Sequence, residues 1–224
     1  MSAPLIVFDL DGTLIDTAPD LIGTLNALLE REGLAPVPLD SARILIGGGG
    51  RRMIQGGWAQ HGRKVTPEQL ERLYADFIEY YSEHIADFSL PFPGLDAALD
   101  ALEDHGCQFA VCTNKTERLA VQLLDTLGLS SRFLAICGHD TFGIPKPDPT
   151  ILRGTIGRAG GRMETAVMVG DSGTDIDTAR AAGIPVVAVD FGYSETAVSL
   201  LKPDCVISHY DDLAAAVRAL LPAS

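Results

Sequence analysis

The stretch LIVFDLDGTLIDT, residues 5–17, decides the fold class. An apolar run leads into Asp9 and Asp11, and aliphatic residues then resume before Asp16. A continuous apolar run of this length is typical of a strand buried on both faces of a parallel sheet. A buried carboxylate is strongly unfavourable unless its charge is compensated. The stretch therefore predicts a buried strand whose carboxyl end carries a site that requires negative charge.

Four further apolar runs resemble the first. They are CQFAVCT at 107–113, FLAICG from Phe133, TAVMVGD from Thr165 and PVVAVD from Pro185. Helical patterns separate them, as in sheets whose parallel strands are joined by crossover helices. The sequence predicts an α/β fold, a doubly wound parallel sheet with a Rossmann-like core.

The region between the first two strands has a different pattern. From about residue 15 to residue 91 we find helix-like segments and no strand. This predicts an α-helical cap domain at 15–91, inserted into a catalytic core formed by 1–14 plus 92–224. Within the insert, Asp40 and Thr66 are expected N-caps, the latter with Gln69 completing a capping box. Pro91 and Pro93 are expected to stiffen the return to the core.

Composition limits the classes of partner. The chain has 224 residues, 46% hydrophobic and 21% charged, with a net charge of -13. This charge disfavours nucleic acid and anionic membrane surfaces. The four cysteines show no C-x-x-C spacing, and the N-terminal residues do not form a basic leader. No apolar run approaches the roughly 18 residues of a membrane span. We therefore expect a cytoplasmic protein with reduced thiols. A monomer and a homodimer both remain open.

Polar residues follow four of the expected strands. In a parallel sheet the carboxyl ends of the strands meet at one edge, where ligands bind. We therefore expect the following residues to converge: Asp9, Asp11 and Gly12 after the first strand, Thr113, Asn114 and Lys115 after the second, Lys146 after the third, and Asp171 and Asp175 after the fourth.

The four acids indicate a metal ion. Asp9 and Asp11 are two residues apart, which points both side chains the same way in extended chain. Oxygen ligands without paired histidines or cysteines favour Mg²⁺ over Zn²⁺. The other residues expected at this edge of the sheet suit a phosphate-sized anion. They offer the Thr113 hydroxyl, the Asn114 amide, the Gly12 backbone and the Lys146 charge.

The motifs of this chain are D-x-D-G-T, a threonine after the second strand, G-x-x-K-P and G-D-S-x-x-D. They resemble those of the haloacid dehalogenase-like superfamily in its phosphatase branch. The resemblance covers nearly the whole chain and is greatest to phosphoglycolate phosphatase-type enzymes. It implies a small phosphorylated metabolite as partner, with 2-phosphoglycolate the first candidate, and hydrolysis through an aspartyl-phosphate.

The resemblance also implies roles for the first pair of acids. Asp9 would be the nucleophile and a Mg²⁺ ligand. Asp11 would be the general acid and base, with its backbone carbonyl facing the metal. Dehalogenases of the same superfamily lack the second aspartate, so Asp11 favours phosphoryl transfer over cleavage of a carbon–halogen bond.

The remaining motifs receive the other roles that the resemblance implies. Thr113 and Lys146 would hold the phosphoryl oxygens. Asp171 would ligate Mg²⁺, with Asp175 a ligand directly, through water, or as an orienting neighbour. Asp175 is equally placed to cap a helix.

In the insert, GGGG at 47–50 precedes Arg51 and Arg52. Two interpretations stay open. Either the glycines form a flexible break with solvated arginines, or a loop offers Arg51 to the far end of the substrate.

Three other functions compete with a phosphatase. A sugar-phosphate mutase would need cations early in the insert, which has none before Arg31. A phosphonatase would need a Schiff-base lysine in the insert, whose only lysine is Lys64. A non-catalytic binding module on the same fold is least favoured, because every residue that the chemistry requires is present.

Overall fold

The computed structural model describes residues 3–39 and 43–221, and its main element is a six-stranded sheet with the order β5-β4-β1-β6-β7-β8. All five pairings in it are parallel. The strands are β1 Leu5–Phe8, β4 Gln108–Cys112, β5 Phe133–Cys137, β6 Ala166–Gly170, β7 Val186–Val189 and β8 Cys205–Ile207. The predicted doubly wound α/β class is confirmed. The sequence did not predict β8, because three residues are too few to show a pattern.

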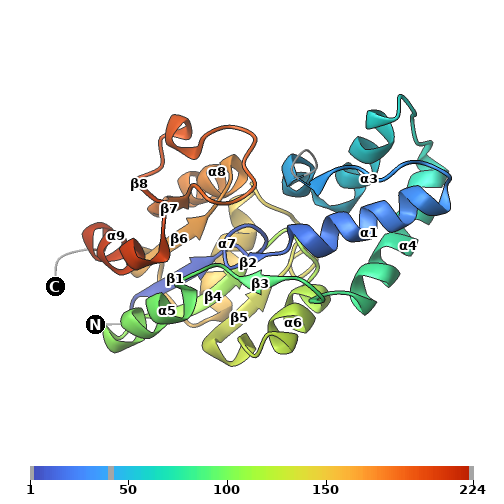
Figure 1. Cartoon of the computed structure of the whole chain (residues 1–224). Coiled ribbons are helices and arrows are strands. Elements are labelled where there is room, and N and C mark those ends of the chain that lie inside the picture. Colours follow the sequence, from blue (N-terminus) through green and yellow to red (C-terminus); the bar gives the residue numbers. More distant parts are fainter. Residues whose placement is uncertain (1–2, 40–42, 222–224) are drawn as a thin grey trace. The chain divides into compact units, whose positions relative to one another are not determined.

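Helices lie between most of the strands along the chain, and one helix follows the last strand (Figure 1). They are α5 Leu95–Asp104, α6 Glu117–Thr126, α7 Pro149–Arg158, α8 Gly173–Ala182 and α9 Leu213–Leu220. Short 3₁₀ turns lie in the connecting segments: η2 Ser130–Arg132, η3 Met163–Thr165, η4 Val198–Leu201 and, after the last strand, η5 Tyr210–Asp212.

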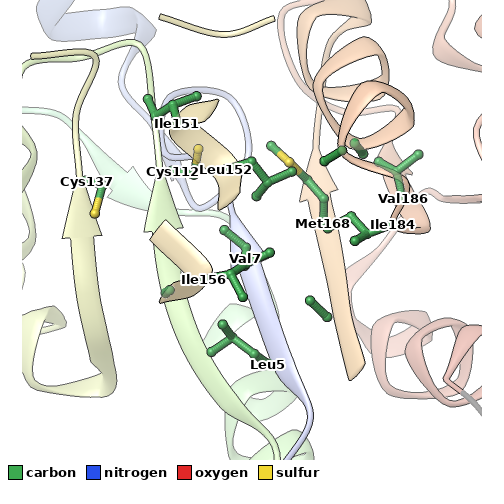
Figure 2. Packing of buried hydrophobic residues seen from close by; sticks show 14 of the residues in the cluster. Leu5, Val7, Cys112, Cys137, Ile151, Leu152, Ile156, Met168, Ile184 and Val186 are labelled. Carbon is green, nitrogen blue, oxygen red and sulfur yellow. The ribbon is translucent and has the colours of Figure 1, made fainter. Parts of the chain in front are cut away.

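Both faces of the central strand β1 are buried. Leu5 and Val7 of β1 pack in the same cluster as Ile156 of α7 (Figure 2). Their neighbours Ile6 and Phe8 are fully buried on the other face. Because alternate residues point to opposite faces, a strand without an exposed position requires helices on both sides. This explains why the strand sequences are continuously apolar.

The chain divides into two compact units. Unit 1 is Met1–Asp16 with Pro91–Ser224, and unit 2 is Thr17–Leu90. Unit 2 contains α1 Ala18–Arg31, the 3₁₀ turn η1 Arg43–Gly48, α3 Gly49–Gln60 and α4 Pro67–Glu83. These helices contact one another, and Leu25, Ile54 and Phe77 are buried among them. Unit 2 thus has its own apolar core.

The prediction that residues 15–91 contain no strand is wrong at both ends. Two-residue strands β2 Ile15–Asp16 and β3 Leu90–Pro91 pair where the chain leaves and re-enters unit 1. A pairing of two residues leaves no periodic signal, and it depends on segments 74 or more positions apart in sequence.

Helix starts in unit 2 were partly predicted. The capping box at α4 is confirmed: Thr66 Oγ1 accepts from the Gln69 N–H at 3.2 Å, and Gln69 Oε1 accepts from the Thr66 N–H at 3.1 Å. The helix-like pattern expected from residue 40 is a 3₁₀ turn over its described part, 43–48. Asp40, the other expected cap, lies outside the described residues.

Candidate active site

Polar residues continue the central strands at their carboxyl ends. In the parallel register Phe8 lies opposite Val169, so the residues that follow β1 and β6 reach the same edge. The Asp9 N–H donates to the Val169 carbonyl at 2.9 Å, and the Thr113 N–H donates to the Cys137 carbonyl at 3.0 Å. The backbone of both residues is therefore fixed by the hydrogen-bond ladder of the sheet.

Three carboxylates gather at this edge. Asp9, Asp171 and Asp175 each offer an oxygen, and these oxygens lie within 4.8 Å of one another. All three residues are buried. Lys146 enters the cluster from the loop after β5: its Nζ lies 2.9 Å from Asp9 Oδ1 and donates to Asp175 Oδ1 at 2.6 Å. The cluster thus holds three acidic side chains and one lysine.

The excess of acidic over basic side chains in this buried cluster shifts the pKa values of its members. Burial raises the pKa of Asp9 to about 6, and the charges of Asp175 and Asp11 add to the rise, although Lys146 acts in the opposite direction. Burial, Asp175 and Asp9 also raise the pKa of Asp171 well above its usual range. Burial alone would lower the pKa of Lys146, but Asp175 and Asp9 raise it, so the lysine keeps its proton.

This donor set fits a hard divalent cation. The cluster offers carboxylate oxygens, and among the described residues no histidine or cysteine joins it. Hard cations prefer oxygen ligands. A cation bound here would also supply positive charge that a single lysine does not, which would favour the ionised form of each carboxylate.

Gly12 allows the loop after β1 to approach the cluster. Its φ of +82° lies in the left-handed region that glycine tolerates. A Cβ built at this position would lie 2.4 Å from Asp171 Oδ2. Any side chain here would displace the carboxylate, so the glycine of the D-x-D-G-T motif is explained by space as well as by its backbone conformation.

Asp11 has a partner that the sequence analysis did not assign. The Nζ of Lys115 donates to both carboxylate oxygens of Asp11, at 2.8 and 3.0 Å. The lysine side chain is only 5% exposed. The strand-end argument that selected Thr113 also selected Lys115, three residues beyond β4, but its contact with Asp11 was not expected.

Asn114 lies where expected but binds the protein itself. Its Nδ2 donates to the Lys146 carbonyl at 3.2 Å, and its Oδ1 accepts from the Lys146 N–H at 2.8 Å. The amide therefore clamps the backbone of the lysine that enters the cluster. Thr113 is buried beside it, and its Oγ1 accepts from the Lys115 N–H at 3.2 Å.

Asp175 has two kinds of contact at once. Its Oδ2 accepts from the Ser172 N–H at 3.1 Å and from Ser172 Oγ at 2.6 Å, which forms the capping box that begins α8. Its Oδ1 accepts from Lys146. The helix-cap interpretation is therefore confirmed, and the same carboxylate also belongs to the acidic cluster.

Tyr193, in the loop after β7, was missed. Its N–H donates to Asp171 Oδ2 at 2.6 Å, and its hydroxyl donates to Asp16 Oδ1 at 2.6 Å. The carboxyl ends of four strands were considered in the sequence and that of the fifth, after Val189, was not. The same rule applied there would have found this residue.

Arg51 lies in unit 2, on α3. Its Nε and Nη2 donate to the two carboxylate oxygens of Glu71 at 3.0 and 2.8 Å. Its guanidinium also lies 3.7 Å from the ring centroid of Tyr74. The arginine is therefore held by its own unit and is not simply solvated.

Comparison with known proteins defines the family. Residues 6–189 match the family described as haloacid dehalogenase-like hydrolase. The chain is 49% identical over 213 residues to a phosphoglycolate phosphatase of Mesorhizobium japonicum, covering 95% of this chain and 94% of that protein. It is 46% identical to a phosphoglycolate phosphatase of Agrobacterium fabrum, over 97% and 92% of the two chains. This chain belongs to the haloacid dehalogenase-like hydrolase family.

A solved structure agrees with this assignment. The crystal structure of a protein described as a predicted phosphoglycolate phosphatase from Haemophilus somnus 129PT superposes with a TM-score of 0.87 at 28% identity. The match covers 95% of this chain and 97% of the other. Within the described residues, no helix is both long and apolar enough to cross a membrane.

Proposed function

We propose that this protein is a Mg²⁺-dependent phosphatase that hydrolyses a small phosphomonoester through an aspartyl-phosphate intermediate. The first candidate substrate is 2-phosphoglycolate. The observation that carries the proposal is the buried cluster in which Lys146 contacts Asp9 beside Asp171 and Asp175. The names of the relatives, at up to 49% identity, support the choice of substrate. An anionic substrate is compatible with a net charge of -13 only where local cations dominate.

In the first half of the proposed reaction, a carboxylate oxygen of Asp9 attacks phosphorus and the bond from phosphorus to the leaving oxygen breaks. Asp11 gives its proton to the leaving alkoxide. In the second half, Asp11 takes a proton from water, the water oxygen attacks phosphorus, and the bond from phosphorus to Asp9 breaks. Inorganic phosphate leaves and Asp9 is restored.

The surrounding residues support these two steps. Lys146 holds Asp9 at 2.9 Å and offsets its charge against the incoming anion. Thr113 would donate its hydroxyl to a phosphoryl oxygen, and Asn114 keeps Lys146 in place through its backbone. Lys115 holds the Asp11 carboxylate by both oxygens.

Asp9, Asp171 and the backbone carbonyl of Asp11 would hold Mg²⁺. When bound, the cation would neutralise negative charge between the phosphoryl group and the carboxylates. Both oxygens of Asp175 accept hydrogen bonds from protein groups, Oδ1 from Lys146 and Oδ2 from Ser172. This favours Asp175 as an orienting neighbour or a ligand through water over a direct ligand.

We assign unit 2, Thr17–Leu90, the role of a cap that selects the leaving group. Arg51, held by Glu71, is the candidate for contact with a substrate carboxylate. We place the enzyme in the cytoplasm, and its four cysteines are free thiols.

The test is an initial-rate screen of phosphate release with Mg²⁺ across 2-phosphoglycolate, sugar phosphates, nucleotides and pyrophosphate. Asp9→Asn is expected to lower kcat by at least about 10³-fold, because the variant lacks the nucleophile. Asp125→Asn, which changes an exposed aspartate of α6, is the matched control and should keep full activity. Circular dichroism verifies that both variants fold.

Two outcomes would contradict the proposal. Full activity of Asp9→Asn would exclude the aspartyl-phosphate. Transfer of phosphate between sugars without net hydrolysis would identify a mutase.

A further inference from the structure

The loop after β7 connects the carboxylate cluster to the end of β2. Through its backbone N–H, Tyr193 holds Asp171 Oδ2 at 2.6 Å, and through its hydroxyl it holds Asp16 Oδ1 at 2.6 Å. The residue is 5% exposed. Hydrogen bonds this short to carboxylates are among the stronger ones in proteins. One residue thus joins a member of the cluster to Asp16 at the end of β2.

Glycines on both sides make this contact close. A Cβ at Gly192 would lie 2.3 Å from Asp171 Cβ and 2.6 Å from the Gly12 carbonyl oxygen. A Cβ at Gly12 would lie 2.8 Å from Cδ2 of Tyr193. The loops that follow β1 and β7 therefore meet at Asp171 without room for another atom, and a shift of the tyrosine ring would be transmitted to both.

Part of the loop after β7 borders a cavity and is not packed against other residues there. Gly192, Ser194 and Asp171 line a cavity of about 310 Å³ together with residues 196–199. Where a cavity replaces packed atoms, the dispersion contacts that restrain a segment are missing. The bond from the Tyr193 hydroxyl to Asp16 is then an anchor that fixes the position of the loop, and with it the Asp171 carboxylate.

We propose that Tyr193 is a positioning residue that sets the affinity of the carboxylate cluster for a divalent cation. The inference rests on the proposed Mg²⁺ site of the phosphatase. A group that orients a metal ligand typically contributes about 10- to 100-fold to metal affinity. Tyr193→Phe keeps the ring and the N–H to Asp171 and removes the hydroxyl that bonds to Asp16, so Mg²⁺ affinity is expected to fall about 10-fold.

The measurement is the unfolding midpoint of the substrate-free protein as a function of Mg²⁺ concentration, which reports binding without turnover. The Mg²⁺ concentration that gives half of the maximal shift should rise about 10-fold in Tyr193→Phe. At saturating Mg²⁺ its kcat should return to near the wild-type value. Asp16→Ala should cause a similar loss, and the double variant should lose little more, because both changes break the same bond.

Tyr210→Phe is the matched control. Tyr210 is also buried, and its hydroxyl donates to the Thr13 carbonyl at 2.7 Å. Its removal should lower the unfolding midpoint without changing the Mg²⁺ concentration for half of the shift. Equal loss of Mg²⁺ affinity in both variants, or none in Tyr193→Phe, would overturn the inference. If the wild-type protein shows no Mg²⁺-dependent shift, the metal site of the proposed function itself fails.

Discussion

At the scale of single residues, carboxylates of the site have specific donors. Lys146 contacts Asp9 and Lys115 contacts Asp11, and both lysines are buried. A buried ion pair orients its carboxylate, and removal of either partner leaves the other charge uncompensated. The proposed acid and base therefore depends on a lysine that is not itself expected to touch phosphorus.

Lys115→Met tests this dependence. The substitution keeps the length of the side chain but removes both contacts to Asp11. We expect kcat for 2-phosphoglycolate to fall about 10- to 100-fold, since general acid–base catalysis contributes roughly 10²–10⁴. Formation of the phosphoenzyme from p-nitrophenyl phosphate should be less affected in single-turnover measurements, because its leaving group needs little protonation.

Lys64→Met, at an exposed lysine of unit 2, is the control for the loss of one positive charge. An equal loss of rate for the alkyl and the aryl substrate would argue against a role of Lys115 through Asp11.

At the scale of secondary-structure elements, two helices begin with capping boxes that have different consequences. The box at α8 joins Ser172 to Asp175, so the cap and the acidic cluster share one carboxylate. The box at α4 joins Thr66 to Gln69 and is exposed. The first couples the start of a helix to the site, whereas the second acts only on the stability of its helix.

Thr66→Ala should therefore lower the free energy of unfolding by about 1 kcal/mol without changing kcat. Urea denaturation followed by circular dichroism measures the first quantity, and phosphate release measures the second. Thr126→Ala is the control, because that exposed hydroxyl bonds to the Gln122 carbonyl within its own helix and caps nothing. A change of no more than about 0.5 kcal/mol is expected there, and an equal loss in both variants would contradict the capping argument.

At the scale of the whole molecule, the site buries several carboxylates close together in a protein that is already acidic. The net charge is -13, and burial raises the pKa of Asp9 from 3.8 to about 6. Between these two values the unfolded chain releases a proton that the folded chain keeps. The contribution of Asp9 to stability therefore falls as pH rises from about 4 to about 6, and it stays unfavourable above that range.

In the absence of metal, Asp9→Asn should accordingly be more stable than the wild type at pH 7, by about 1–3 kcal/mol at roughly 1.4 kcal/mol per pKa unit. At pH 4 the difference should nearly vanish. Urea denaturation in a chelator at the two pH values measures it. Saturating Mg²⁺ should narrow or reverse the difference, because the cation stabilises the wild-type carboxylates. If the difference in free energy of unfolding between the two proteins did not depend on pH, ionisation of Asp9 would not be its cause.

Much of the molecule could be predicted from local sequence patterns. Sequence patterns predicted five of the six strands of the sheet, namely β1, β4, β5, β6 and β7, and the capping box of α4. They also predicted that Asp9, Thr113 and Asp171 follow strand ends. A strand buried on both faces must be apolar along its whole length, and a polar residue at its end is then conspicuous. These signals are local, so a single sequence contains them.

Tertiary structure alone decided which side chains meet. Lys115 contacts a residue 104 positions away, and the hydroxyl of Tyr193 contacts one 177 positions away. Asn114, which was expected near an anion, binds the backbone of Lys146, 32 positions away. Such contacts depend on loop conformations and on the order of the strands, which leave no periodic trace in the chain. The sequence therefore determined the fold class and the acids of the site, whereas tertiary structure decided which donor holds each of them.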